Sequence, residues 1–338
     1  MAVSPADRDP GHGLAPGPDR GIESDRRLLD LILHYDCNLA CDYCTISPQM
    51  RTRVLSTAAA IAAMERARAD GITRISLTGG EPTIRPDLLG LVRRAVELGF
   101  DEIKLQTNGL LLGAGQNLAR LIDAGVGLVH VSIHTHERVA YEELVRRPGT
   151  YDALVGGLRA LVAARVPTVA DVILQRSTYA RLGAALRWLH ALGITAADLW
   201  FVSLTDHNRD NVASMPRMTE VLPSLAAALT CADELGMRVR SLHIPRCLLG
   251  PLHEYAWNPA DDGVRVVSPD ASFDLRASRL TPGTRVPACS GCEHEARCPG
   301  IRADYLDRYG DAEFAAARGL AAQRHLPVVP VVPVVPVV

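Results

Sequence analysis

The sequence predicts an α/β protein organised around a parallel β-sheet. Short apolar runs typical of strands alternate six times with segments whose apolar residues recur at helical spacing. Glycine follows several of the helical segments, where a left-handed C-cap is favoured. Consecutive strand–helix units of this kind pair their strands in parallel, with right-handed crossovers.

The elements follow one another at short intervals. The predicted strands are Leu28–His34, Arg74–Leu77, Glu102–Gln106, Leu128–Ile133, Thr168–Leu174 and Asp198–Val202. The predicted helices are Thr57–Ala69, Pro86–Leu98, Gln116–Ala124, Tyr151–Ala164, Tyr179–Leu192 and Thr219–Leu235, with capping glycines at Gly71, Gly99, Gly125, Gly193 and Gly236. Six units are too few for a closed eight-stranded barrel, so the pattern fits either an open doubly wound sheet or a partial barrel.

The pattern changes after about Met237. Val264–Val267 and Ser272–Leu275 predict a hairpin, and little helix is expected before Ala303. We therefore expect a large domain at 26–236 and a small one at 237–325. The remaining segments are a disordered tail at 1–25 and a Pro-Val-Val repeat at 326–338, which is either an extended appendage or a docking segment.

Composition excludes several classes of protein. Of the 338 residues, 48% are apolar and 22% charged, which is ordinary for a soluble globular protein. The net charge is −2, so the chain lacks the basic surplus of a nucleic-acid binder. The basic residues are almost all arginine, and Lys104 is the only lysine. No run of about 18 uncharged apolar residues and no signal peptide is evident. We expect a cytoplasmic protein without nucleic-acid or membrane partners.

Three cysteines lie directly after the first predicted strand. Cys37, Cys41 and Cys44 have the spacing C-x3-C-x2-C, and Tyr43 precedes the last of them. Three thiolates on one loop can bind three irons of a cubane cluster and leave the fourth iron open to a chelating cofactor. Zinc sites prefer C-x2-C pairs and four closed ligands. The spacing therefore favours an iron–sulfur cluster over zinc or buried thiols.

A glycine-rich turn follows the second predicted strand. In the run Thr78-Gly79-Gly80-Glu81-Pro82-Thr83, the glycines allow the backbone to approach a ligand, and Glu81 can accept a hydrogen bond from an ammonium group. Alone, the run is equally a strand-to-helix turn. One strand–helix unit after the cysteine loop, it makes the chain resemble the radical S-adenosylmethionine (radical SAM) superfamily. The resemblance implies a partial (β/α)6 TIM-type barrel, with Gly79, Gly80 and Glu81 at the amino group of SAM.

The resemblance also implies SAM contacts from polar residues near the cysteines and at other strand ends. These are Tyr43, Thr107, Asn108, Ser132, Gln175 and Arg176. Asn108 and Gly109 can equally form a plain turn. The histidines near the fourth strand, His130, His134 and His136, are expected to be solvated or substrate-facing rather than a metal cluster.

A second group of cysteines lies in the predicted small domain. Cys289, Cys292 and Cys298 have the spacing C-x2-C-x5-C, and Cys247 lies upstream. The C-x2-C pair is a common half-site for structural zinc. The arrangement also resembles the twitch or truncated SPASM extension of radical SAM enzymes, which implies one auxiliary [4Fe–4S] cluster. If Cys247 is not a ligand, an open iron there can bind the substrate. Cys231 is predicted to be a core residue.

The resemblance implies an enzyme that reductively cleaves SAM to a 5′-deoxyadenosyl radical, which then abstracts a hydrogen from the substrate. It implies an electron donor such as flavodoxin or ferredoxin. We expect peptide maturation or natural-product biosynthesis, ahead of the same chemistry on a small metabolite such as a sugar, nucleoside or amino acid. A non-catalytic iron–sulfur or zinc scaffold is the alternative of another class, and the intact Gly-Gly-Glu turn argues against it. No catalytic side chain is identified.

Overall fold

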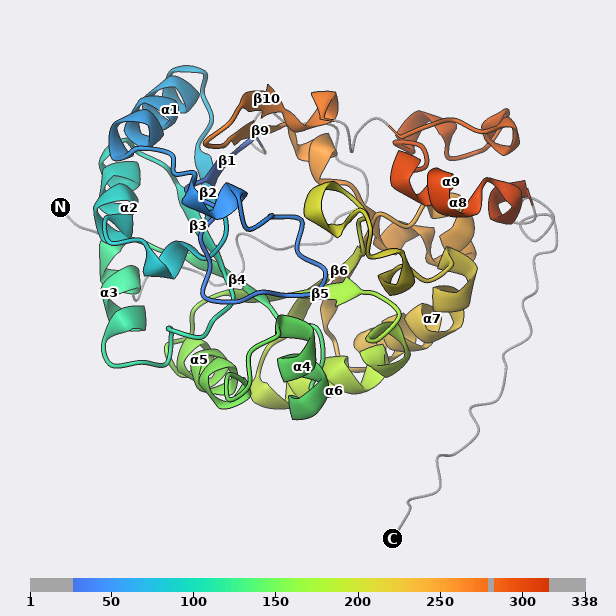
Figure 1. Ribbon diagram of the computed structural model, residues 1–338, viewed down its shortest axis with the longest axis horizontal. Helices are drawn as coiled ribbons and strands as arrows, with labels where there is room; N and C mark the ends of the chain where they lie inside the picture. Colours follow the sequence, from blue (N-terminus) through green and yellow to red (C-terminus); the bar gives the residue numbers. More distant parts are fainter. Residues whose placement is uncertain (1–26, 279–282, 316–338) are drawn as a thin grey trace, which may run out of the picture.

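The computed structural model describes residues 27–278 and 283–315 (Figure 1). The predicted tails at 1–25 and 326–338 lie outside the described residues. Within the described ranges, no helix is both long and apolar enough to cross a lipid bilayer.

The described chain forms one ten-stranded sheet with the order β10-β9-β1-β2-β3-β4-β5-β6-β7-β8. Its first six strands are all parallel, which confirms the predicted α/β class. Because β10 and β8 are edges, the barrel is not closed, as a partial barrel requires. These strands are β1 (Leu28–Ile32), β2 (Arg74–Thr78), β3 (Glu102–Thr107), β4 (Leu128–Ser132), β5 (Thr168–Leu174) and β6 (Ala196–Phe201).

Helices cover the outer face of the sheet and form an arc around it in Figure 1. They are α1 (Thr57–Ala69), α2 (Leu88–Glu97), α3 (Asn117–Ala124), α4 (Arg138–Val145), α5 (Tyr151–Ala163), α6 (Leu182–Leu192) and α7 (Met218–Glu234). Each predicted helix is present within a few residues. The sequence analysis missed α4, because this short helix buries only Tyr141, Leu144 and Val145, while its other large apolar residue, Val139, is exposed.

The chain beyond Met237 extends the same sheet at both edges. It contains β7 (Arg238–Leu242), α8 (Arg246–Leu249), β8 (Ala256–Trp257), β9 (Val264–Val267), β10 (Ser272–Asp274) and α9 (Ala303–Tyr309). β7 pairs with β6, β9 pairs with β1, and β9 and β10 form the predicted antiparallel hairpin. The sequence analysis missed β7, in which arginines alternate with Val239 and Ser241. The division at 236/237 stays a prediction, since the sheet runs across it.

The two faces of the strands differ in polarity, because successive side chains point to opposite sides. Outward-facing residues such as Leu29, Leu31, Ile75 and Leu105 are fully or almost fully buried against the helices. Inward-facing residues are largely polar and line a cavity of about 1230 Å³. The cavity lining extends from the amino ends of the strands, at Leu28 and Arg74, to the loop after β1, at Thr45 and Ile46. This loop crosses the barrel in Figure 1.

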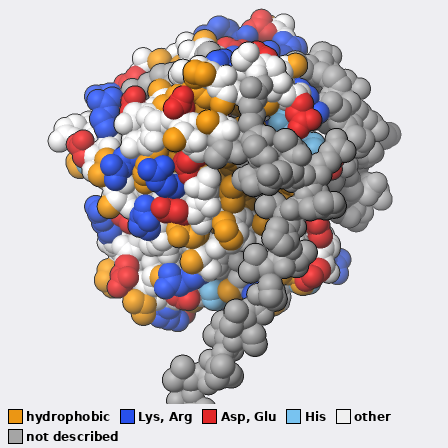
Figure 2. Space-filling view, turned by 90° about the vertical axis from the view of Figure 1, so that its right-hand side faces the viewer, with side chains coloured by type: hydrophobic (Ala, Val, Ile, Leu, Met, Phe, Trp, Pro, Cys, Tyr) orange, Lys and Arg blue, Asp and Glu red, His pale blue; other side chains and the backbone are white. Residues whose placement is uncertain are grey.

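On the face shown in Figure 2, the described side chains show no concentration of one charge. Arginine side chains are interspersed there with aspartate and glutamate, and hydrophobic side chains are scattered between them. This mixture agrees with the net charge of −2.

Candidate functional site

Cys37, Cys41 and Cys44 lie together on the loop between β1 and the 3-10 turn η3 (Met50–Thr52). All three are half-buried and free of disulfide bonds. Arg51 holds the loop: its guanidinium donates to the carbonyl oxygens of Cys37 at 2.8 Å and Leu39 at 2.6 Å. The sequence analysis did not identify Arg51, because nothing in the local pattern distinguishes it from a surface arginine.

The three thiols share a low-polarity environment. Burial raises the pKa of Cys41 to about 12 and also raises the pKa of Cys37 and Cys44. The neighbouring thiols raise the pKa of Cys37 and Cys41 further. Such thiols lose their protons when a metal binds. Three unpaired thiols on one well-held loop therefore fit three irons of a cubane cluster.

Tyr43 is fixed by a hydrogen-bond chain behind this loop. The backbone N–H of Ile173 donates to His134 Nδ1 at 3.1 Å, so the neutral ring carries its proton on Nε2. His134 Nε2 lies 2.5 Å from the Tyr43 hydroxyl, which also bonds to the thiol of Cys41. Burial lowers the pKa of His134 to about 3, which keeps the ring neutral.

The three histidines near β4 are in different environments. His134 is buried, so the expectation that it is solvated or substrate-facing was wrong. His130 lines the barrel cavity, in agreement with a substrate-facing position. His136 is half-buried in the loop that follows β4.

The Gly-Gly-Glu turn packs directly on the start of the cysteine loop. Gly80 N–H donates to the carbonyl oxygen of His34, and Glu81 N–H donates to that of Asp36, both at 2.8 Å. Gly79 has a φ of 141°, and a Cβ on Gly80 would lie 2.0 Å from the Asp36 oxygen. Close backbone packing, rather than only ligand approach, therefore requires the two glycines.

Glu81 ties this turn to the end of β3. Its Oε1 accepts from the backbone N–H and hydroxyl of Thr83 at 3.0 and 2.5 Å and from the Thr107 hydroxyl at 2.7 Å. Its Oε2 accepts from the backbone N–H of Asn108 at 2.7 Å. One acceptor position on Oε2 remains. The predicted contact of Glu81 with the amino group of SAM stays a prediction.

Two other predicted residues lie against the cysteine loop. The Asn108 amide donates to Asn38 Oδ1 at 2.6 Å, next to Cys37. The Gln175 amide donates to Asp42 Oδ1 at 3.3 Å, and Gln175 Oε1 is buried without a partner among the described residues. Both side chains thus lie where a ligand of the loop would bind.

The SAM contacts predicted for Ser132 and Arg176 stay predictions, and the two residues lie in different surroundings. Ser132 is half-buried at the carboxyl end of β4, facing the same side as the cysteine loop. Arg176 instead binds Glu220 at 3.2 Å and the carbonyl oxygen of Met215 at 3.2 Å. These partners belong to α7 and the segment before it, so Arg176 has a structural role there.

The second group of cysteines also comes together, although Cys247, on α8, lies about 40 residues before the other three in the sequence. Burial and the three other thiols raise the pKa of Cys247 to about 12. None of the four forms a disulfide bond, and all are half-buried. Four thiols fit either an iron–sulfur cluster or zinc. The group consists of Cys247, Cys289, Cys292 and Cys298.

Residues next to both groups of cysteines line the same cavity. Its wall includes Thr45 and Ile46, which follow Cys44, and Arg246, which precedes Cys247. Arg297 and Pro299, on either side of Cys298, also line it. The fold therefore brings chain neighbours of both groups to one cavity, which sequence spacing alone does not reveal.

Comparison with known sequences identifies the first part of the chain. Residues 31–195 match the model of the radical SAM superfamily. The GTP 3′,8-cyclase of Moorella thermoacetica is 38% identical over 152 residues, covering 41% of this chain and 44% of that protein. That of Erythrobacter litoralis is 31% identical over 209 residues, covering 58% and 60%. The chain thus spans about half the length of the curated relatives it matches.

Comparison with solved structures extends the similarity of the fold. Streptococcus suis SuiB bound to its precursor peptide SuiA has a TM-score of 0.64 at 13% identity, covering 83% of this chain and 72% of that one. anSMEcpe with bound AdoMet and the Cp18Cys peptide has a TM-score of 0.61 at 15% identity, covering 88% and 99%. Identities this low show the fold alone. The match to the family model identifies residues 31–195 as a domain of the radical SAM superfamily, whose cofactors are a [4Fe–4S] cluster and S-adenosylmethionine.

Proposed function

We propose that the chain is a radical SAM enzyme that acts on a small molecule in the barrel cavity. The observation that carries the proposal is the position of this cavity, bordered by residues next to Cys44 and residues next to Cys247 and Cys298. A substrate there is within reach of both cofactor sites and is enclosed by the strands.

In this proposal Cys37, Cys41 and Cys44 bind the radical SAM cluster. The turn at Gly79–Glu81, together with Asn108 and Gln175, positions SAM beside it. When bound, the cluster and SAM supply a carbon-centred radical that can remove a hydrogen atom from a substrate. The barrel wall and the cysteine loop orient the substrate and exclude water from the reaction.

A small-molecule substrate is better supported than a peptide. The sequence relatives are named for action on GTP, and they match the chain at 31–38% identity. The structural neighbours with bound peptides match at only 13–15%, which supports a common fold and nothing about substrate. This reverses the order expected from the sequence, and a sugar, nucleoside or amino acid becomes the preferred class.

The second group of cysteines is proposed to bind an auxiliary [4Fe–4S] cluster. Burial raises the pKa of Cys247 and Cys298, and Arg246, Arg297 and Pro299, their neighbours in the chain, line the substrate cavity. Four thiols in this position suit a cluster that exchanges an electron with the substrate or binds it. A flavodoxin or ferredoxin remains the proposed electron donor.

An anaerobic reconstitution tests the proposal. The protein is loaded with iron and sulfide, reduced and mixed with SAM, and 5′-deoxyadenosine is measured. We expect roughly eight irons per chain and formation of 5′-deoxyadenosine. Replacing Cys37, Cys41 and Cys44 together by alanine should remove half of the iron and all SAM cleavage. Replacing Cys289 and Cys292 should remove the other half and leave some SAM cleavage.

Cys231→Ser is the matched control. Cys231 is buried on α7, apart from both groups, and accepts only from Arg187 at 3.3 Å. This variant should keep the full iron content and SAM cleavage. Cleavage that survives the triple variant contradicts the assignment of the cluster. Clusters that assemble without any SAM cleavage in the wild type favour the non-catalytic scaffold.

A further inference from the structure

The barrel interior carries polar side chains at the level where closed barrels pack branched apolar ones. These side chains come from consecutive strands between β1 and β7. All except Ser76 and Asp171 line the cavity. We call them the polar layer, and they are Asp30, Ser76, Lys104, His130, Asp171, Asp198 and Arg240.

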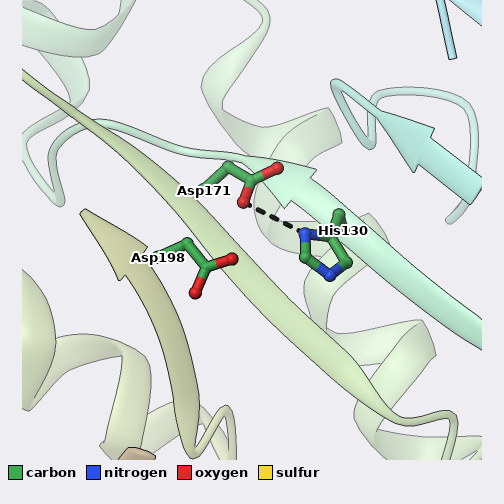
Figure 3. A group of neighbouring side chains, drawn as sticks. All are labelled: His130, Asp171 and Asp198. Carbon is green, nitrogen blue, oxygen red and sulfur yellow. Dashed lines mark hydrogen bonds and ion pairs between the residues drawn. The ribbon is translucent and has the colours of Figure 1, made fainter. Parts of the chain in front are cut away.

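His130 is held in one orientation within the polar layer. Its Nδ1 lies 3.1 Å from Asp171 Oδ1, which also accepts from Trp200 Nε1 at 3.3 Å (Figure 3). A carboxylate only accepts, so Nδ1 carries a proton, and in the neutral ring Nε2 is an acceptor. Nε2 points away from Asp171 in Figure 3 and has no hydrogen bond to a described residue. The His130 side chain is 9% exposed.

The same group of residues superficially resembles a metal site. One ligand atom from each of His130, Asp171 and Asp198 lies within 4.8 Å of the others. However, Arg240 already binds both oxygens of Asp198, at 2.7 and 2.5 Å. A guanidinium in this position neutralises the carboxylate and repels a second cation. The group therefore fits a hydrogen-bonding network better than a metal ion.

Lys104 supplies a free donor beside this network. Other cations on the cavity wall are paired, since Arg240 binds Asp198 and Arg74 binds Glu102 at 2.8 Å. The Lys104 ammonium forms no hydrogen bond or ion pair with any residue in the described ranges. Lys104 is also the only lysine in the sequence, so the cavity contains the only lysine ammonium group of the protein.

Asp30, on β1, lies near Lys104 and carries a carboxyl group that can also contact a ligand in the cavity. Burial raises the pKa of Asp30, and the charge of Lys104 acts in the opposite direction, so the two side chains are near enough to attract each other. They are nevertheless not joined by a direct ion pair in the described structure. The space between them is part of the cavity.

The charges of these three groups nearly cancel. Lys104 donates, whereas Asp30 and the Nε2 of His130 accept. An anionic ligand group would be repelled by Asp30 and a cationic one by Lys104, but a hydroxyl group both donates and accepts. The geometry points to a polyhydroxylated substrate group, such as a ribose or another sugar ring, bound by Lys104, His130 and Asp30. This inference rests on the proposed function, because it names the substrate class for the same cavity.

Matched ligands test the inference on the cluster-loaded full chain. Guanosine is compared with 2′,3′-dideoxyguanosine, which lacks the ribose hydroxyls, and glucose and myo-inositol serve as further probes. Binding is followed by calorimetry and by tryptophan fluorescence, since Trp200 and Trp257 line the cavity. We expect at least one hydroxylated probe to bind, and guanosine to bind roughly tenfold more tightly than its dideoxy counterpart.

Variants of the polar layer should remove this preference. Lys104→Met and His130→Gln should each weaken binding of the hydroxylated probe roughly tenfold. His190→Gln is the control, because His190 lies in the last turn of α6, outside the barrel. If a thermal melt shows that His130→Gln does not fold, Lys104→Met still tests the inference, because the Lys104 ammonium group forms no contact with a described residue that the fold would lose.

Several outcomes overturn the inference. They are equal binding of the two nucleosides, wild-type binding by both variants, and failure of every hydroxylated probe to bind. Tight binding of Mn²⁺ that depends on His130 also overturns it, in favour of a metal site. SAM cleavage is measured separately in the wild type. Cleavage without probe binding defeats only this inference, whereas probe binding without cleavage defeats only the proposed function.

Discussion

At the residue scale, the candidate site depends on how closely Gly80 approaches the cysteine loop. The turn after β2 lies against His34 and Asp36, so each hydrogen bond between them fixes the position of Cys37. Glu81, which accepts from Thr83, Thr107 and Asn108, fixes the same turn from the other side. The residues of the motif therefore support the loop as well as any ligand.

Gly80→Ala should disrupt this packing. The added Cβ would meet the Asp36 carbonyl oxygen at 2.0 Å, and backbone atoms on both sides must move. We expect the free energy of unfolding to fall by about 3 kcal/mol and the bound iron to fall with it. Urea unfolding and iron analysis measure the two effects.

Gly90→Ala is the matched control for this change. Gly90 lies inside α2, and its Cβ would meet nothing within 4 Å. Removing backbone freedom from a helix interior should raise the free energy of unfolding by about 0.5–1 kcal/mol. Equal effects of the two substitutions would contradict the packing argument for Gly80.

At the element scale, Arg85 joins β1, the segment before α1 and the turn before α2. Its buried guanidinium donates to the carbonyl oxygens of Leu33 at 2.7 Å and Leu55 at 2.8 Å. Asp87 balances its charge with contacts of 2.5 and 2.9 Å and accepts from Thr57 at 2.5 Å. A buried charge of this kind is stable only while its partner is ionised.

Asp87→Asn should therefore destabilise the fold in a pH-dependent way. The hydrogen bond from Arg85 lowers the pKa of Asp87 to about 2, below its value of about 3.9 in the unfolded chain. The ion pair thus stabilises the fold above about pH 4, and this contribution is lost as the pH falls toward 2. We expect a loss of about 1–2 kcal/mol near pH 7 that shrinks below about pH 4.

Urea unfolding at several pH values checks this expectation, with Glu65→Gln as control. Glu65 and Arg94 form an exposed pair on neighbouring helices, so the control should cost about 0.5 kcal/mol or less. A constant difference between wild type and Asp87→Asn down to low pH would show that the charge of Asp87 is not the cause.

At the scale of the whole molecule, the C-terminal helix α9 is packed onto the barrel. Tyr305 is fully buried against Phe201 at the end of β6, with ring centroids 5.9 Å apart. Its hydroxyl accepts from the backbone N–H of Met218 at 2.8 Å and donates to Glu313. The segment with the second group of cysteines is thus attached to the first domain at both of its ends, since β9 pairs with β1.

Tyr305→Phe should lower the stability of the whole molecule. It leaves the Met218 N–H at the start of α7 buried without a partner, which costs about 1–3 kcal/mol. Because α9 and the barrel share this core, urea unfolding followed by circular dichroism and by fluorescence should give one coincident transition. Tyr179→Phe, whose hydroxyl bonds to no described residue, should change stability by less than about 0.5 kcal/mol. Separate transitions would mean that the C-terminal segment unfolds independently.

The sequence by itself determined the parallel α/β class, the six strand–helix units and the two groups of cysteines. Local periodicity and spacing carry this information, because each depends on residues close together in the chain. The sequence analysis missed β7, whose Arg240 lines the cavity, and misjudged His134, which is buried against Tyr43.

Only the tertiary structure decided which distant residues share a site. It placed residues next to both groups of cysteines on one cavity and assembled the polar layer from strands spread over much of the chain. An inward-facing Lys104 or His130 has the same local pattern as an exposed residue on a strand. The curvature of the sheet makes the difference, since it turns one face of every strand toward a common interior.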